Sequence, residues 1–370
     1  MADAMLEVDR RQVLAYRVAA HQLDRAGDDP SHLAVFDLGV PDTPYGSARL
    51  ALAARAADPD LAPDGTLTLA WSTRGAPHLH RTGDLLPFAA ALWPLSDADA
   101  TARIANTQIR EGSRLGLAAF TAAAQALREV VTSPLPKGEV SGAVSARVPA
   151  SLTYWCRSCG AQHISGALFQ QAGLAGGVRL EPGGQATTLA PIDGWPGVPT
   201  AAVGTDALVT AYLRLLGPAT QAETAKYLGT TQTELRRAWP HGLAEVRVDG
   251  RRAWLPADRV AMLRSAPAPR LVRLLPPGDP YLQARDREML VPGKARQSEV
   301  WRMLGNPGAL LVDGEIAGVW RARMVGKKAL EVTVTPFEPL AAGTRDAVHE
   351  EAGRVAAVRG APSARLKLEG

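Results

Sequence analysis

The segment over residues 207–258 constrains the fold of this chain more than any other. It contains two helix-capping motifs, Thr-Gln-Ala-Glu at 220–223 and Thr-Gln-Thr-Glu at 231–234, with Gly229 between them. In such a motif the threonine hydroxyl accepts a hydrogen bond from a free helix amide, and the glutamate reaches back to the threonine amide. Two capped helices joined by a glycine turn predict a helix-turn-helix, and an apolar face over 207–216 predicts a helix before it.

A β-hairpin is expected directly after these helices. Residues 244–248 and 251–255 read as strands, and Asp249-Gly250 stands between them, which is the strongest short sequence signal for a hairpin. Three helices followed by a basic hairpin are typical of a winged helix that docks on DNA. The candidate DNA contacts of this segment are Arg236, Arg237, Arg247, Arg251 and Arg252. A winged helix that serves protein contacts or packing is the alternative.

Positive charge is concentrated after residue 115. The chain carries 41 Lys and Arg against 37 Asp and Glu, a formal net charge of +4, although residues 1–115 are net negative. A polyanion should therefore dock mainly on the later part of the chain. Residues 264–302 contain eight basic against four acidic residues, and Arg285 and Arg287 are further candidate DNA contacts there.

Two earlier regions repeat the plan of helices and strands more faintly. In the N-terminal region the last predicted helix covers residues 47–57. This helix carries the candidate DNA contacts Arg49 and Arg55. Capping residues and periodicity predict further helices over 9–23, 31–39, 115–131 and 137–146, and strands over 66–73 and 151–155. Glycines and prolines between 191 and 205 indicate a linker.

The C-terminal part changes character. Asp313-Gly314 predicts another hairpin over 309–320, residues 328–335 alternate like a strand, and residues 344–358 form an amphipathic helix. The predicted fold class is α+β, with tandem winged-helix units and a small C-terminal β-barrel or sheet closed by a helix. We expect the units to cover residues 1–113, 114–200, 201–265 and 266–370.

Only two cysteines occur, Cys156 and Cys159. A disulfide framework is therefore excluded, and a reducing, cytoplasmic compartment is expected. Together with His163 they have a spacing that zinc sites use, but no fourth Cys or His lies near in the sequence. A plain turn with two thiols is the other reading, and we predict no metal and no other cofactor. The chain has no run of about 18 apolar residues, so no membrane span is expected.

Several motifs in order resemble one known family. They are Leu38–Pro44 ahead of a helix with Arg55, Cys156-Arg-Ser-Cys159 with His163, Leu274–Leu282 followed by Arg285-Asp-Arg287, and Leu310–Trp320. Nearly the whole chain resembles the winged-helix family that includes the AlkZ-like and YcaQ-like DNA glycosylases. This resemblance implies tandem winged-helix units that form a cradle for double-stranded DNA, alkylated or crosslinked. We separately expect a monomer. It also implies hydrolysis of the N-glycosidic bond of bulky N7-alkylated purines, or unhooking of interstrand crosslinks.

The family's chemistry depends on a Gln-x-Gln or Gln-x-Asp pair, and this chain departs from it. The corresponding stretch places Pro41 at the first position and Thr43 at the second, and a shift of the alignment by one residue places Asp42 at the second. N7-alkylation already makes the base a good leaving group, so the enzyme has to position a water and stabilise the developing positive charge on the sugar. Asp42 is the one strong base of the segment, and Asp42 and Thr43 are the catalytic candidates. The alternatives are that Asp42 is a turn or helix N-cap residue and that the chain is a non-catalytic DNA-binding protein.

Overall fold

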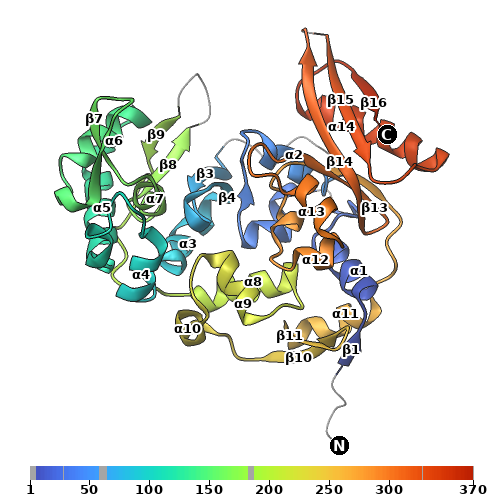
Figure 1. Ribbon diagram of the computed structural model, residues 1–370, viewed down its shortest axis with the longest axis horizontal. Coiled ribbons are helices and arrows are strands. Elements are labelled where there is room, and N and C mark those ends of the chain that lie inside the picture. Colours follow the sequence, from blue (N-terminus) through green and yellow to red (C-terminus); the bar gives the residue numbers. More distant parts are fainter. Residues whose placement is uncertain (1–5, 28, 58–64, 182–186, 327, 370) are drawn as a thin grey trace, which may run out of the picture. The chain divides into compact units, whose positions relative to one another are not determined.

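The computed structural model describes residues 6–27, 29–57, 65–181, 187–326 and 328–369. Helices and strands are mixed, so the α+β class is confirmed. Internal contacts divide the chain into two compact units, and Figure 1 labels the elements of both. The first unit comprises residues 1–63, 210–223 and 241–370, and the second comprises 64–209 and 224–240. Within the described ranges no helix is long and apolar enough to cross a membrane.

The C-terminal part of the first unit is a sheet covered by a helix. Its strands pair in the order β12 (Val272–Leu275), β13 (Gly308–Val312), β14 (Glu315–Val325), β15 (Ala329–Pro336) and β16 (Ala364–Leu368). All neighbours are antiparallel except β15 and β16, which are parallel. Helix α14 (Ala342–Val358) packs on one face, where Val348 and Ala352 meet Leu330, Val332 and Val334. The hairpin, strand and helix predicted here are confirmed, whereas β16 was not foreseen.

The N-terminal residues of the first unit begin with β1 (Leu6–Val8) and α1 (Arg10–Ala20). Asp9 caps α1 as predicted, because its carboxylate accepts a 2.8 Å hydrogen bond from the amide of Gln12. The helix expected over 31–39 is wrong: two short 3-10 helices, Pro30–His32 and Ala34–Asp37, stand there. The extended backbone of Leu33 separates them, and Asp29 caps the first in place of Ser31. Strand β2 (Val40–Pro41) and helix α2 (Ser47–Ala53) follow.

A second, smaller sheet in the first unit contains the hairpin predicted near residue 250. Strand β10 (Leu243–Val248) pairs with β11 (Arg251–Pro256), and β1 adds to β10 in parallel. Asp249 and Gly250 have positive φ angles of 47° and 76°, as a two-residue turn of this kind requires. Helix α11 (Val260–Ser265) supports the sheet, whose core includes Val13, Tyr16 and Leu255.

The capped helices predicted between residues 205 and 239 are present. They are α8 (Thr205–Leu216), α9 (Gln221–Leu228) and α10 (Gln232–Leu235), and a 3-10 turn extends α10 over Arg236–Ala238. Both hydrogen bonds of the first capping box form, at 2.7 Å and 3.2 Å between Thr220 and Glu223. The second box forms only on the threonine side, because the carboxylate of Glu234 accepts a 2.8 Å hydrogen bond from Ser96 instead.

The second unit is built on an antiparallel sheet with helices. The strands pair in the order β4 (Pro77–Arg81), β3 (Leu67–Trp71), β8 (Val178–Glu181), β9 (Thr188–Pro191) and β5 (Leu135–Pro136). The helices are α3 (Leu85–Leu92), α4 (Asp97–Ile104), α5 (Leu117–Val130), α6 (Lys137–Ser145) and α7 (Gly166–Gln171). A core that includes Trp71, Phe120 and Phe169 joins them. Strands β6 (Thr153–Cys156) and β7 (Ala161–Ile164) form a separate hairpin.

Candidate functional site

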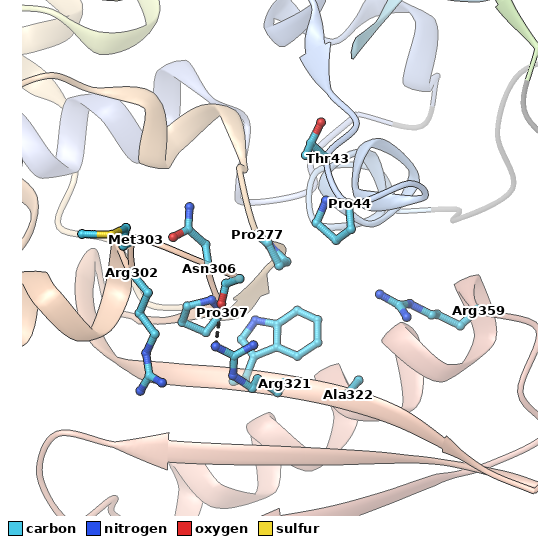
Figure 2. Close-up of a pocket in the computed structure, with 12 residues that line it drawn as sticks. Thr43, Pro44, Pro277, Arg302, Met303, Asn306, Pro307, Arg321, Ala322 and Arg359 are labelled. Atoms are coloured by element: carbon cyan, nitrogen blue, oxygen red, sulfur yellow. Dashed lines mark hydrogen bonds between the residues drawn. The ribbon is translucent and has the colours of Figure 1, made fainter. Parts of the chain in front are cut away.

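A pocket of about 510 Å³ lies in the first unit beside the loop that follows β2 (Figure 2). Thr43 and Pro44 of that loop lie on one side of it, and Arg321 of β14 lies on another. Trp320 of β14 is also part of the lining. The segment between α13 (Lys294–Val300) and β13 supplies further residues. The full lining is Thr43, Pro44, Pro277, Arg302, Met303, Gly305, Asn306, Pro307, Trp320, Arg321, Ala322 and Arg359. One catalytic candidate, Thr43, is therefore part of a pocket wall.

This pocket has a positive lining. Arg302, Arg321 and Arg359 contribute three guanidinium groups, and no carboxylate is among the described lining residues. In the described part of the chain none of the three arginines forms an ion pair, and Arg321 donates a 2.6 Å hydrogen bond to the carbonyl of Gly305. Guanidinium groups without acidic partners favour phosphate and other oxyanions, which they bind in bidentate geometry.

The pocket continues over the exposed face of the C-terminal sheet. A neighbouring hollow of about 580 Å³ shares Arg302, Trp320 and Arg321 with it. The two basic residues that line only this hollow are paired with acids: Arg323 with Glu331 at 2.7 Å, and Lys367 with Glu369 at 2.5 Å. The excess of positive charge thus lies at the Thr43 end of the surface.

The floor of the pocket depends on close packing around Trp320. This side chain is buried, and its indole nitrogen donates a 2.7 Å hydrogen bond to the carbonyl of Leu275. A Cβ atom at Gly308 would lie 2.2 Å from that indole nitrogen, so only glycine fits there. The Gly308–Trp320 hairpin therefore positions Arg321, the next residue of β14.

Asp42 lies next to the pocket but is not part of its lining. Its side chain is 7% exposed, and its carboxylate accepts a 2.9 Å hydrogen bond from the amide of Ala48 at the start of α2. Burial raises the pKa of Asp42, while hydrogen bonds from the amides of Gly46, Ser47 and Ala48 oppose this shift. The carboxylate holds the first turn of α2, but the N-cap residue of this helix is Gly46, so Asp42 is not the N-cap residue that the alternative expected. Thr43 is exposed beside it.

Arg55 is not available for DNA contacts, and that prediction is wrong. Its side chain is 0% exposed, and its guanidinium forms two hydrogen bonds with Asp279, at 2.9 Å and 2.7 Å. Arg17 forms a similar pair with Asp286 at 2.6 Å. Asp279 and Asp286, both in the segment 274–287, therefore hold the N-terminal arginines in the interior of the first unit.

Of the remaining basic candidates, most are at the surface and Arg285 is not. Arg49, Arg247 and Arg287 are exposed, and Arg287 stacks on Trp301 at 4.8 Å from the ring centroid. Arg285 is half-buried, and its backbone amide donates to the hydroxyl of Tyr212 at 3.4 Å. Arg236 and Arg237 are exposed in the second unit.

Two arginines of the β10–β11 hairpin have acidic partners. Arg251 lies 3.6 Å from Glu223, and Arg252 pairs with Glu245 and stacks on Trp254. The side chains of both arginines are about two-thirds exposed or more, at 70% and 66%. Such surface ion pairs contribute about 0–1 kcal/mol, so a phosphate group can displace the carboxylates.

The sequence did not single out the pocket arginines as a group. Arg302, Arg321 and Arg359 are far apart in the chain and lie on three different elements. The structure adds one observation beside Gly305-Asn-Pro307: Met303 and Leu304 are 98% and 87% exposed, although both are large and apolar. Surface loops that carry exposed apolar side chains are frequent at binding sites.

His78 and His80 of β4 belong to the second unit and are buried. Burial lowers the pKa of His78 to about 4 and that of His80 to about 3. The ring of His80 packs edge-on against Phe88 with 4.5 Å between centroids. Both imidazoles are therefore neutral parts of a core at neutral pH.

One group of side chains in the second unit has the composition of a metal site. The ligand atoms of Cys156, Cys159 and His163 all lie within 4.8 Å of one another on the β6–β7 hairpin. The hydroxyl of Ser158 lowers the pKa of the Cys156 thiol to about 7. Other groups of three or more such ligands are not found among the described residues.

Comparison with known proteins gives two matches. A family model described as DNA glycosylase AlkZ-like matches residues 31–358. The solved structure of Streptomyces sahachiroi DNA glycosylase AlkZ is similar in fold, with a TM-score of 0.76 and 22% sequence identity. That similarity covers 98% of this chain and 100% of the other. Among curated protein sequences none matches.

Proposed function

Because the chain belongs to the AlkZ-like DNA glycosylase family, we propose that it binds double-stranded DNA that is alkylated or crosslinked. The observation that carries this proposal is the pocket beside Thr43, with Arg302, Arg321 and Arg359 and no acidic side chain among its described lining. Three guanidinium groups in one concave surface suit the phosphates that flank a displaced nucleotide. A monomer is expected to bind one site on the duplex.

We further propose that winged-helix units provide the rest of the DNA surface. Residues 205–256 contain helices and a hairpin in the order of a winged helix, with exposed arginines on the hairpin. The proposed boundaries of the units are 1–113, 114–200, 201–265 and 266–370. In this scheme Arg247, Arg251 and Arg252 contact phosphates and contribute no base specificity.

Hydrolysis of the N-glycosidic bond is the second candidate function, with Asp42 as the base and Thr43 assisting. It is favoured by the desolvated carboxylate of Asp42, whose neighbour Thr43 lines the pocket. A carboxylate can orient a water molecule and oppose the positive charge that develops on the sugar. The carboxylate of Asp42 already accepts a hydrogen bond from the first turn of α2, however, so binding without catalysis agrees better with its contacts.

The decisive experiment uses a duplex with a single N7-methylguanine and a matched undamaged duplex. Binding that weakens steeply with salt supports the DNA-binding proposal. Strand cleavage after alkali treatment supports catalysis, and Asp42→Asn should then abolish cleavage without loss of affinity. Pro41→Gln restores the glutamine of the family motif. If this variant excises the lesion and the unmodified protein does not, the glutamine side chain is the group that the site lacks. The absence of affinity for both duplexes at moderate salt would overturn the proposal.

A further inference from the structure

The β6–β7 hairpin of the second unit has a geometry that the proposed DNA surface does not explain. Cys156 and Cys159 stand at the ends of a tight turn, in which the amide of Gly160 donates a 2.9 Å hydrogen bond to the carbonyl of Cys156. Gly160 has a φ of 62°, a conformation that glycine adopts without strain. The turn thus directs two thiols to the same end of the hairpin.

His163 supplies a third donor from the returning strand. It pairs across the hairpin with Tyr154, two residues before Cys156. Its Nδ1 lies 3.3 Å from the hydroxyl of Ser141 on α6, and its Nε2 is buried without a hydrogen-bond partner among the described residues. A ring that donates through Nδ1 leaves a lone pair on Nε2, which is the tautomer that a metal ligand needs.

We propose that Cys156, Cys159 and His163 bind a zinc ion. Zinc prefers thiolate and imidazole ligands in tetrahedral geometry, with bonds of about 2.3 Å and 2.0 Å that place ligand atoms roughly 3.5–3.8 Å apart. The three ligand atoms lie within 4.8 Å of one another, so a shift of about 1 Å closes the site. The hydroxyl of Ser158 lies 3.2 Å from the sulfur of Cys156 and 3.9 Å from that of Cys159. It can stabilise the thiolates by hydrogen bonding without being a ligand itself.

The fourth coordination position of this zinc is open. Among the described residues no further Cys, His, Asp or Glu joins the group. Cys159 is exposed, so a water molecule or an added ligand reaches the metal from solvent. The ion would link the two strands of the hairpin. It would thereby fix the position of Trp155, which is 60% exposed.

The test measures zinc in untagged protein purified without chelator. The expected content is one zinc per chain, with loss of the metal in Cys159→Ser and in His163→Ala. The matched control is His349→Ala, because His349 is an exposed histidine of α14 in the other unit. This control should keep its zinc. Circular dichroism of each variant separates loss of a ligand from loss of the fold.

Cobalt replaces zinc as a spectroscopic probe in the intact chain. Reconstitution should give the thiolate charge-transfer and tetrahedral d–d bands of cobalt, and added imidazole should shift them because one position is open. A protein that takes up neither metal after reduction of its thiols overturns the proposal, as does a Cys156–Cys159 disulfide that re-forms in the presence of zinc. Retention of zinc by a folded His163→Ala variant would also overturn it. None of these measurements involves DNA, so they stand apart from the proposed function.

Discussion

The first unit uses arginine in two opposite ways. Arg17 and Arg55 are fully buried, and each is neutralised by one aspartate of the 274–287 segment. Arg302, Arg321 and Arg359 line an open pocket without an acidic side chain among its described residues. The difference teaches that burial and an acidic partner, rather than position in a basic stretch of sequence, decide whether an arginine stabilises the fold or is available to a ligand.

Removal of a buried arginine should have the largest effect on stability. Arg55→Ala leaves Asp279 buried without its partner, so the free energy of unfolding should fall by about 3–5 kcal/mol, as measured by urea denaturation. The double variant Arg55→Met/Asp279→Leu should recover most of this loss, since no buried charge is left unpaired. A change below about 1 kcal/mol for Arg55→Ala would mean that the pair behaves like one at the surface.

Buried basic side chains without acidic partners, such as His78 and His80, should behave differently from Arg17 and Arg55. Burial holds the pKa of His78 at about 4 and that of His80 at about 3, below the ordinary 6.5. Stability is therefore constant above pH 6.5 and is lost as the pH falls from 6.5 toward those values, because the unfolded chain takes up the protons first. The slope is at most about 1.4 kcal/mol per pH unit for each histidine.

Denaturation curves at pH 7 and pH 5 test this expectation. His80→Leu should reduce the acid-induced loss of stability, because it removes one of the two contributing groups. A loss of equal size in the variant and the unmodified protein would show that His80 is protonated in the folded state.

The pocket side of the comparison is tested by replacing Arg302, Arg321 and Arg359 together with alanine. The free energy of unfolding should change little, since these side chains form no ion pair in the described ranges. Affinity for duplex DNA should fall, and its dependence on salt should weaken by about 0.9 in the logarithmic slope for each phosphate that the protein no longer neutralises. Binding assays across a salt series measure this slope. An unchanged slope would exclude the pocket from the DNA surface.

The smallest effect is expected from the β10–β11 hairpin. Replacing Arg251 and Arg252 with alanine should also flatten the salt dependence, but by less per residue than in the pocket. The reason is that Glu223 and Glu245 already neutralise these arginines before DNA binds. If the salt dependence of DNA affinity changes as much per residue as it does for the pocket arginines, acidic partners make no difference to how surface arginines contact DNA.

Local elements could be read from the sequence, because local residues determine them. The capping box at Thr220 and Glu223 and the turns at Asp249-Gly250 and Asp313-Gly314 form as predicted. Strands β1 and β16 were missed, since short strands that add to a sheet edge depend on partners far away in the sequence. The helix expected over 31–39 failed because Leu33 adopts an extended backbone between two short turns.

The candidate site was less predictable than the fold. Arg55 and Asp279 are separated by 224 positions, so the burial of Arg55 left no local signal. The pocket arginines come from a loop, a strand and the end of a helix, and only folding brings them together. Asp42 and Thr43 could be found by position in the family motif, but which of the two faces the pocket depends on how the chain enters α2.

Asp42 has an electrostatic consequence for the surface around it. A negative charge next to a DNA site would ordinarily repel the phosphates. Here the carboxylate lies at the N-terminus of α2, where the positive end of the helix dipole and the amide of Ala48 offset its charge. In the proposed DNA complex, a phosphate beside Thr43 is therefore repelled less by Asp42 than by a carboxylate without such contacts. The peptide groups of α2 would thus allow an acidic side chain to stand next to a bound polyanion.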